Sequence, residues 1–369
     1  MANKKSGGFA QMFIPSGKDN AGTVVRKILV IVCLITAIVC GIMIISEKAS
    51  DHRTEQKNEE LQQIANNSAT GSFKAEKEVV EQIKQETPEI PDKLVDLVAK
   101  NPDCIGWVKA GHKIDYPVMM NEEVTDYYLF RDFDGNDTRD GSIFADNHVL
   151  PFEKANNLVL YGHNQMSGEM FATLTYWYPQ GSHGGTNYQD FYSYYKQYPT
   201  VDFQTVNGGE STYKIFAGIY INTEKKDGYP YPYYRKRQFA NEQEFMDFVG
   251  NVMDRSTFYT DVDLEYGDEI ITLSTCYYYP MGKDVDARFA LFARRVRDGE
   301  SPDVDTEKII VNESPLFFDT YANRLSGPWK GRDWVLENVR DWTAKVKNFD
   351  KYDIDSLDEY ESEGPIDAD

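Results

Sequence analysis

Short apolar runs separated by turn-rich polar stretches occupy the middle of the chain, from about residue 105 to residue 296. The runs are rich in β-branched and aromatic residues, and Gly, Pro, Asn and Asp gather between them, which is the pattern of strands and turns. They fall at 105–108, 114–119, 142–144, 157–163, 201–205, 213–221, 268–276 and 288–293. This pattern predicts a mainly β domain with added helices.

Apolar residues at helical spacing predict where those helices lie. In 241–255, apolar residues recur at positions i, i+3, i+4 and i+7, as on one face of an amphipathic helix. They are Phe245, Phe248, Val249 and Val252. A shorter amphipathic helix is predicted at 93–100. The long Tyr-rich loop at 177–199 is expected to contain a helix, and it either shapes a binding groove or covers the domain.

An uncharged apolar run of 18 residues, 28–45, follows a basic segment, 1–27. This is close to the length that a transmembrane helix needs, so we expect an uncleaved single-pass anchor. A cleaved signal peptide is the rival interpretation, but its apolar region is about 7–15 residues long and ends in a small-x-small site, and no Ala-x-Ala follows this run. The basic flank precedes the span, which predicts a cytoplasmic N-terminus and an extracellular remainder.

The polar segment after the apolar run, 46–90, is rich in Gln, Asn, Lys and Glu and has only weak helical periodicity. We interpret it as an extracellular stalk with short helices, a solvated spacer. A catalytic domain is then predicted at 91–298.

The chain changes character again after the β-rich region. Apolar residues spaced like one helix face, Trp334, Leu336, Val339, Trp342 and Val346, lie in a predicted accessory segment, 299–349. The end of the chain, 350–369, carries nine acids and one lysine and is expected to be disordered.

The formal net charge of −21 argues against a nucleic-acid partner. Part of this charge is local, because the stretch from Glu300 to the end contains 18 Asp and Glu against 8 Lys and Arg. The charge therefore excludes one class of partner without identifying another.

Four cysteines and five histidines provide no metal-binding pattern, since no CxxC occurs and the histidines are scattered. Cys33 and Cys40 belong to the apolar run, which leaves Cys104 and Cys276 in the polar part. A disulfide between these two is the minor alternative, and it would consume Cys276. We expect no metal and no cofactor.

Three residues at strand edges form a candidate site for cysteine acyl transfer. Cys276 ends a predicted buried strand, Arg288 begins the next, and His163 ends the predicted strand at 157–163. A cysteine is a useful nucleophile as a thiolate, and nearby cations favour that form. Each residue also has an ordinary structural interpretation: a small buried side chain, a surface ion pair and a turn residue, respectively.

The other histidines are weaker candidates for the acid/base role. His148 is the main competitor of His163. His112 and His183 lie in a hairpin and a Gly/Ser loop, where a solvated side chain is expected.

The chain order His, Cys, Arg differs from that of papain-like enzymes, and the motif around a caspase cysteine is absent. The sequence resembles the sortases, membrane-anchored transpeptidases of Gram-positive bacteria, and in detail class B. The motifs that carry the resemblance, over residues 90–298, are Thr272-Leu273-Ser274-Thr275-Cys276 with Arg288, Tyr161-Gly162-His163-Asn164, Asn101-Pro102-Asp103, Ile105-Gly106-Trp107, Ile114-Asp115-Tyr116-Pro117-Val118, Asp126-Tyr127-Tyr128-Leu129, Gly141-Ser142-Ile143-Phe144 and Gly168-Glu169-Met170-Phe171.

The resemblance implies an eight-stranded sortase-type β-barrel with an N-terminal transmembrane helix. By analogy Cys276 is the nucleophile, His163 the general acid/base and Arg288 the group that positions substrate and stabilises the oxyanion, while Ser274 matches a position thought to assist. The implied reaction cleaves a Leu-Pro-x-Thr-Gly-like or Asn-Pro-x-Thr-like sorting signal after Thr and joins the surface protein to an amine of cell-wall precursor. The tail from about residue 300 lies beyond the usual family barrel.

Three alternatives stay open from the sequence. A pilin-polymerising sortase would use a lysine amine as acceptor, and a plain cysteine peptidase would use water. A catalytically inactive, membrane-anchored ectodomain would only bind its partner.

Overall fold

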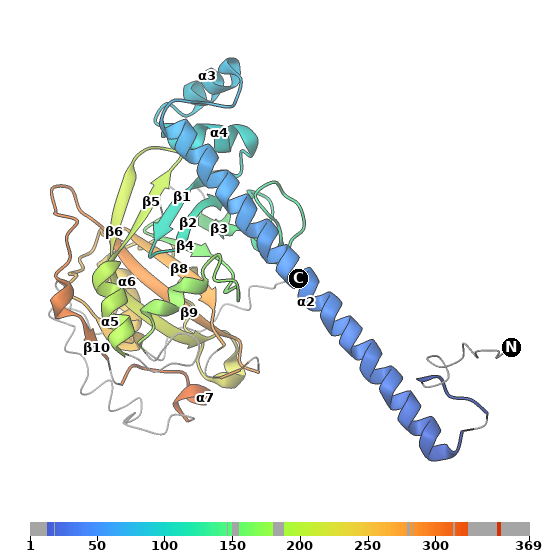
Figure 1. Cartoon of the computed structure of the whole chain (residues 1–369). Helices are drawn as coiled ribbons and strands as arrows, with labels where there is room; N and C mark the ends of the chain where they lie inside the picture. Colours follow the sequence, from blue (N-terminus) through green and yellow to red (C-terminus); the bar gives the residue numbers. More distant parts are fainter. Residues whose placement is uncertain are drawn as a thin grey trace. The chain divides into compact units, whose positions relative to one another are not determined.

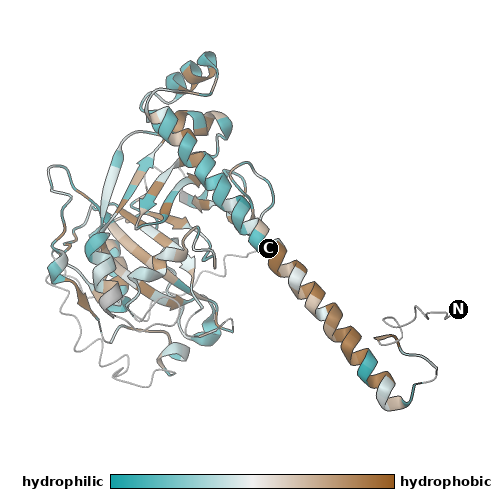
Figure 2. Ribbon diagram, in the orientation of Figure 1, coloured by the Kyte–Doolittle hydropathy of each residue, from teal (hydrophilic) through white to brown (hydrophobic). Residues whose placement is uncertain are grey.

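The computed structural model describes residues 13–17, 19–145, 147–149, 155–179, 188–278, 281–282, 284–312, 314–323 and 345–347. The chain divides into two compact units, Met1–Gln56 and Lys57–Asp369. Most of the first unit is helix α2 (Ala21–Ala69), which begins where the Asn20 side chain accepts a hydrogen bond from the Thr23 amide, 2.9 Å. The apolar run lies in this helix as a continuous hydrophobic stretch (Figure 2), and by length and composition the helix can cross a membrane.

The second unit contains a closed barrel of eight strands, as the resemblance implied (Figure 1). Its neighbours run in the order β1-β2-β3-β4-β8-β9-β6-β5. Two pairs are parallel, β2 with β3 and β4 with β8, and the other pairs are antiparallel. The strands are β1 (Cys104–Ala110), β2 (Ile114–Met119), β3 (Ile143–Ala145), β4 (Asn157–Tyr161), β5 (Thr200–Thr205), β6 (Glu210–Asn222), β8 (Ile270–Cys276) and β9 (Ala287–Arg295).

Alternate side chains of β8 and β9 enter two different cores, because successive side chains of a strand point to opposite faces. Ile271, Leu273 and Leu291 belong to the cluster that fills the barrel interior. Ile270 and Phe292 belong to a second cluster, on the outer face, which includes residues of α6 (Glu242–Arg255). Both faces are therefore buried over most of each strand, which explains why these runs are apolar throughout.

Helix α6 confirms the predicted helix at 241–255. Asn241 caps it, since its side chain accepts from the Glu244 amide at 3.0 Å. The predicted apolar face is buried in the outer cluster, with Phe245 and Val249 fully enclosed. The other helices are α3 (Lys77–Glu86), α4 (Asp92–Lys100), α5 (Tyr188–Gln197), α7 (Asp319–Ala322), and the short 3-10 helices η1 (Tyr127–Phe130), η2 (Asn147–Val149), η4 (Ala172–Trp177), η5 (Lys225–Asp227), η6 (Tyr233–Arg235) and η7 (Thr306–Lys308).

The Tyr-rich loop covers the barrel over its described part. Helix α5 buries Phe191 and Tyr195 in the interior cluster, and the Tyr195 hydroxyl donates to the Ile215 carbonyl at 3.0 Å. Of the two roles expected for this loop, the described residues support the covering one.

The segment at 57–69 departs from the solvated spacer that its composition predicted. It is the end of α2, and one face of it is buried with residues of α4 and β1. Leu61, Ile64 and Ala65 supply the apolar contacts, and the buried Ser68 hydroxyl donates to Asp96 at 2.7 Å. Two of the buried residues of α2, Asn58 and Ser68, are polar, so the apolar periodicity there was too weak to predict the contact.

The chain after β9 continues along the barrel. Strand β10 (Ile310–Val311) pairs with β7 (Phe258–Tyr259), and residues 314–323 end in α7. Val346, at the end of the predicted helix face, forms a parallel bridge with Leu264. Trp334, Leu336, Val339 and Trp342 lie outside the described residues, as does the predicted disordered end, 350–369.

Candidate active site

Cys276 and Arg288 are directly opposite each other on neighbouring antiparallel strands. They form the last register pair of β8 and β9, and both belong to the alternation that faces outside the barrel. Cys276 is partly exposed and a free thiol, and the Arg288 side chain is 26% exposed. Cys104 is also a free thiol, so the alternative Cys104–Cys276 disulfide is absent. The Cys104 side chain is buried, and burial raises the pKa of its thiol to about 12.

His163 reaches the same end of the barrel from the other side of β8. Strand β4 runs parallel to β8 with Tyr161 opposite Ser274, so His163, two residues further, is level with Cys276. Hydrogen bonds extend the ladder beyond the strands: the Gly162 amide donates to the Ser274 carbonyl at 3.2 Å, and Asn164 Nδ2 donates to the Cys276 carbonyl at 2.9 Å. The three residues predicted from sequence are thus brought together by two strand registers.

The His163 ring is held by the segment before β3. Its Nε2 lies 2.8 Å from the Leu129 carbonyl, and its ring is 5.5 Å from that of Phe130. A carbonyl can only accept, so Nε2 carries a proton in this arrangement and Nδ1 is the nitrogen left to exchange one. The competitor His148 is exposed in η2, His112 contacts the Tyr194 hydroxyl at 3.0 Å, and His183 lies outside the described residues.

Arg288 has a carboxylate partner that the sequence reasoning missed. The Asp286 carboxylate accepts hydrogen bonds from Nη1 and Nη2 of the guanidinium, the second at 3.1 Å. It also accepts a hydrogen bond from Thr223 Oγ1 at 2.7 Å. Burial raises the pKa of Asp286, but the bonds from Arg288 and Thr223 outweigh this and keep it below its ordinary value. For Arg288, burial alone would lower the pKa of the guanidinium. The neighbouring Cys276 and Asp286 outweigh burial and raise this pKa above its ordinary value, so the site keeps a permanent cation.

Ser274, the residue expected to assist, is buried beside Cys276 and hydrogen-bonded to another hydroxyl. Its Oγ lies 2.6 Å from the hydroxyl of Tyr233, which belongs to η6. Burial raises the pKa of Tyr233 to about 12, although Ser274 and Arg288 act in the opposite direction. The sequence contained no local signal for this pair, because the two residues come from different elements.

Tyr278 is a second residue that the sequence reasoning did not select. It stands two residues after Cys276 and is 38% exposed. Burial, and then the neighbouring Cys276, raise the pKa of its phenol.

Among the described residues, no group of three or more His, Cys, Asp or Glu side chains is arranged to hold a metal. The described site therefore consists of a thiol, an imidazole, a guanidinium with its carboxylate partner, and the hydroxyls beside them.

Comparisons with known proteins identify relatives of this chain. The model of the Sortase domain family matches residues 112–296. The chain is 31% identical over 191 residues to sortase B of Listeria monocytogenes, which covers 51% of this chain and 68% of that protein. It is 29% identical over 177 residues to sortase B of Staphylococcus aureus, which covers 48% of this chain and 64% of that protein.

Solved structures show the same fold. A complex of S. aureus sortase B with substrate has a TM-score of 0.51 at 24% identity, and covers 68% of this chain and 99% of that one. B. anthracis sortase B in complex with AAEK1 has a TM-score of 0.50 at 24% identity, and covers 67% of this chain and 98% of that one.

Proposed function

Because this chain belongs to the sortase family, class B, we propose that it is a cysteine transpeptidase that cleaves a C-terminal sorting signal after Thr and transfers the surface protein to an amine of cell-wall precursor. The observation that supports this best is the position of β8 between β4 and β9. The strand carrying Cys276 has the His163 strand on one side and the Arg288 strand on the other. A substrate carbonyl above Cys276 is then accessible to all three groups.

In the first half-reaction, the Cys276 thiolate attacks the Thr carbonyl carbon. The new C–S bond forms as the carbonyl π electrons move to oxygen, and Arg288 lies across the strand to stabilise that oxyanion. The C–N bond of the sorting signal then breaks, and His163 supplies a proton to the leaving amine. The result is a thioester between Cys276 and the surface protein.

In the second half-reaction, an amine attacks the thioester. His163, now neutral, accepts a proton from the amine, the C–S bond breaks, and Cys276 leaves as a thiolate. Arg288 again faces the oxyanion of the tetrahedral intermediate. Each group returns to its starting protonation state, so the cycle needs no cofactor.

We propose that the helix α2 anchors this site outside the cell membrane. Its apolar run can cross a membrane by length and composition, and the basic residues before the run favour a cytoplasmic N-terminus. This orientation puts Cys276 on the side where cell-wall precursor and secreted substrates arrive.

The test uses the full chain in detergent micelles with a panel of sorting-signal peptides and three acceptors: a glycine peptide, a lysine-containing pilin-like peptide, and water alone. Mass spectrometry would look for an acyl adduct on Cys276 and for the product of each acceptor. An adduct that is absent in Cys276→Ala and is resolved by the glycine peptide supports the proposal. Resolution by the lysine peptide alone would indicate a pilin-polymerising enzyme, and hydrolysis alone would indicate a peptidase. Peptide binding without any adduct would indicate the inactive ectodomain.

A further inference from the structure

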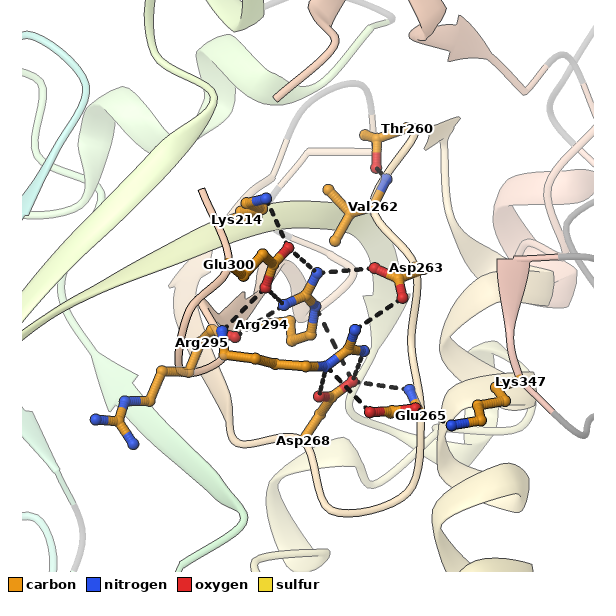
Figure 3. A network of polar contacts seen from close by, with 11 residues as sticks. Lys214, Thr260, Val262, Asp263, Glu265, Asp268, Arg294, Arg295, Glu300 and Lys347 are labelled. Atoms are coloured by element: carbon orange, nitrogen blue, oxygen red, sulfur yellow. Dashed lines mark hydrogen bonds and ion pairs between the residues drawn. The ribbon is translucent and has the colours of Figure 1, made fainter. Parts of the chain in front are cut away.

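The chain beyond the matched family domain, which ends at residue 296, is attached to the barrel at several points. Glu300 accepts hydrogen bonds from Lys214 and from the fully buried Arg294 (Figure 3). Further along, the Asn312 amide donates to the Thr257 carbonyl at 2.9 Å, and the Leu316 amide donates to the Asp254 carbonyl at 2.8 Å. The C-terminal segment, by which we mean the described residues from 299 to 323, therefore has a defined path along the barrel.

This path ends in an aromatic contact with the barrel interior. Phe317, Phe318 and Tyr321 are buried in the interior cluster. The Tyr321 ring is 5.0 Å from that of Tyr220 on β6, and its hydroxyl lies 3.1 Å from that of Tyr178. The segment thus contributes side chains to the core of a domain whose family match does not include it.

The same aromatic group contains the residues that follow Cys276 and Arg288 in the chain. Tyr277 is 5.4 Å from Tyr178 and 5.7 Å from Tyr220, ring centre to ring centre, and Phe289 is 5.6 Å from Tyr178. Because strand side chains alternate, Tyr277 and Phe289 point inward where Cys276 and Arg288 point outward. A shift of these rings would displace the backbone that carries both site residues.

The C-terminal segment also touches the loop between β6 and α6. Thr320 Oγ1 donates to Asp227 Oδ1 at 3.2 Å, and Gly228 has a φ of +120° with so little room that an added Cβ would lie 2.7 Å from the Asp319 nitrogen. Six residues after Asp227, the same loop carries Tyr233, which is hydrogen-bonded to Ser274. The segment therefore supports the site from two directions.

We infer that the C-terminal segment is a brace for the transpeptidase site, meaning that its contacts hold the site residues in position. Tyr321 positions the strands that carry Cys276 and Arg288, and it does so through its contacts with Tyr178 and Tyr220. Thr320 positions the loop that carries Tyr233. Both are positioning residues, since neither touches the thiol. The inference depends on the proposed function for its effect on peptide acylation, but its effect on the Cys276 thiol is independent of any substrate. A displacement of about 1 Å at a reacting group can reduce the rate by up to about 100-fold, so small ring movements are sufficient.

The test compares Tyr321→Ala with Ile309→Ala in the full chain in detergent. Ile309 is a matched control, because it is also a buried apolar residue of the C-terminal segment but precedes the strand that pairs with β7. Three quantities are measured. The rate of peptide acylation and the pH profile of Cys276 alkylation by iodoacetamide, located by peptide mass spectrometry, are measured well below the unfolding temperature of both variants, and the melting temperature is measured separately.

Both variants are expected to melt at lower temperature, but only Tyr321→Ala slows acylation, by about tenfold, and alters the alkylation profile. Tyr321→Phe, which keeps the ring, should restore acylation to within about twofold of the parent. Thr320→Val should raise the KM for the peptide and change alkylation less than Tyr321→Ala does, because it reaches the Cys276 strand only through the hydrogen bond between Tyr233 and Ser274.

Equal acylation and alkylation in Tyr321→Ala and Ile309→Ala would overturn the inference and leave the segment a purely structural element. If no peptide acylates the parent protein, the proposed function fails while the alkylation comparison still decides the brace. If Tyr321→Ala does not fold, an unchanged KM in Thr320→Val overturns the inference and a raised KM supports it.

Discussion

Asp286 binds Arg288 through both terminal nitrogens of the guanidinium, and Arg288 lies opposite Cys276, the proposed nucleophile, on the neighbouring strand. Binding through two nitrogens fixes the plane of the guanidinium, whereas the guanidinium of an arginine without such a partner could rotate. Thr223 donates to the same carboxylate from β6's end at 2.7 Å, so the orientation of Arg288 is determined from a third strand. This relationship leads to the first prediction.

Asp286→Ala should reduce kcat/KM for sorting-signal peptide by about tenfold, less than the ~100-fold expected for Arg288→Ala, because the cation remains but its orientation is lost. Asp286→Asn should fall between the parent and Asp286→Ala, since the amide keeps one acceptor. Steady-state kinetics with the full chain would measure this. The exposed neighbour Asp284, changed to Asn, is the control for the loss of one negative charge. Equal losses in Asp284→Asn and Asp286→Asn would contradict a specific role for Asp286.

The pair of Tyr233 and Ser274 allows a double-mutant cycle. Ser274→Ala and Tyr233→Phe each remove one hydroxyl of a buried contact of 2.6 Å, so each should destabilise the fold by about 1–2 kcal/mol, and the double variant by less than the sum. Ser274→Ala should retain more activity than Cys276→Ala by a wide margin, since its hydroxyl is already paired. Denaturant unfolding and acylation rates would test both statements. Tyr234→Phe, on the adjacent residue, is the control, and strictly additive effects in the cycle would show that the two hydroxyls are not coupled.

The ion-pair network around Arg294 predicts a pH-dependent contribution to stability (Figure 3). Hydrogen bonds from Arg294 and Lys214 outweigh burial and lower the pKa of Glu300 well below its ordinary value. A carboxylate with a lowered pKa in the folded state stabilises the protein fully above its unfolded pKa of about 4.3, and this contribution disappears as the pH falls through the folded value.

Glu300→Gln should therefore lower the free energy of unfolding by on the order of 2 kcal/mol at pH 7, and the difference from the parent should shrink as the pH falls below about 4. Thermal or denaturant unfolding at several pH values would measure it. Glu307→Gln is the matched control, because Glu307 forms an exposed ion pair with Lys196 and should cost less than ~1 kcal/mol. A difference for Glu300→Gln that is the same at pH 3 and pH 7 would contradict this assignment.

Asn58 connects the end of α2 to the loop that follows His163. Its Nδ2 donates to Glu169 at 3.0 Å, and Glu169 also accepts from the Tyr116 hydroxyl at 2.9 Å. Asn58→Ala should destabilise the second unit by about 1 kcal/mol and increase amide hydrogen exchange in 163–171. Glu59→Ala, on the exposed face of the same helix, should change neither. If Asn58→Ala had no effect on that exchange, the hydrogen bond between Asn58 and Glu169 would not stabilise this loop.

The local pattern of the chain was enough to predict the strands, the face of α6 and the three residue types of the site. These signals work because each lies within one element: a short apolar run bounded by turn residues for a strand, a period of 3.6 for a helix, and a polar or reactive residue at a strand end. The sortase motifs around Cys276 and His163 suggested roles for the three residues, and these roles stay predictions. The length and charge of the N-terminal run likewise predicted a helix long enough to cross a membrane, as found in α2.

The contacts that support the site come from the tertiary structure. Tyr233 meets Ser274 across 41 residues of sequence, Asn58 meets Glu169 across 111, and Tyr321 meets Tyr178 across 143. Such contacts depend on which strands become neighbours, on their register and on closure of the barrel. No local period encodes these choices, because they arise from packing of the whole domain. The candidate reacting residues could therefore be proposed from a few short motifs, whereas the residues that contact them could be named only once the barrel was closed.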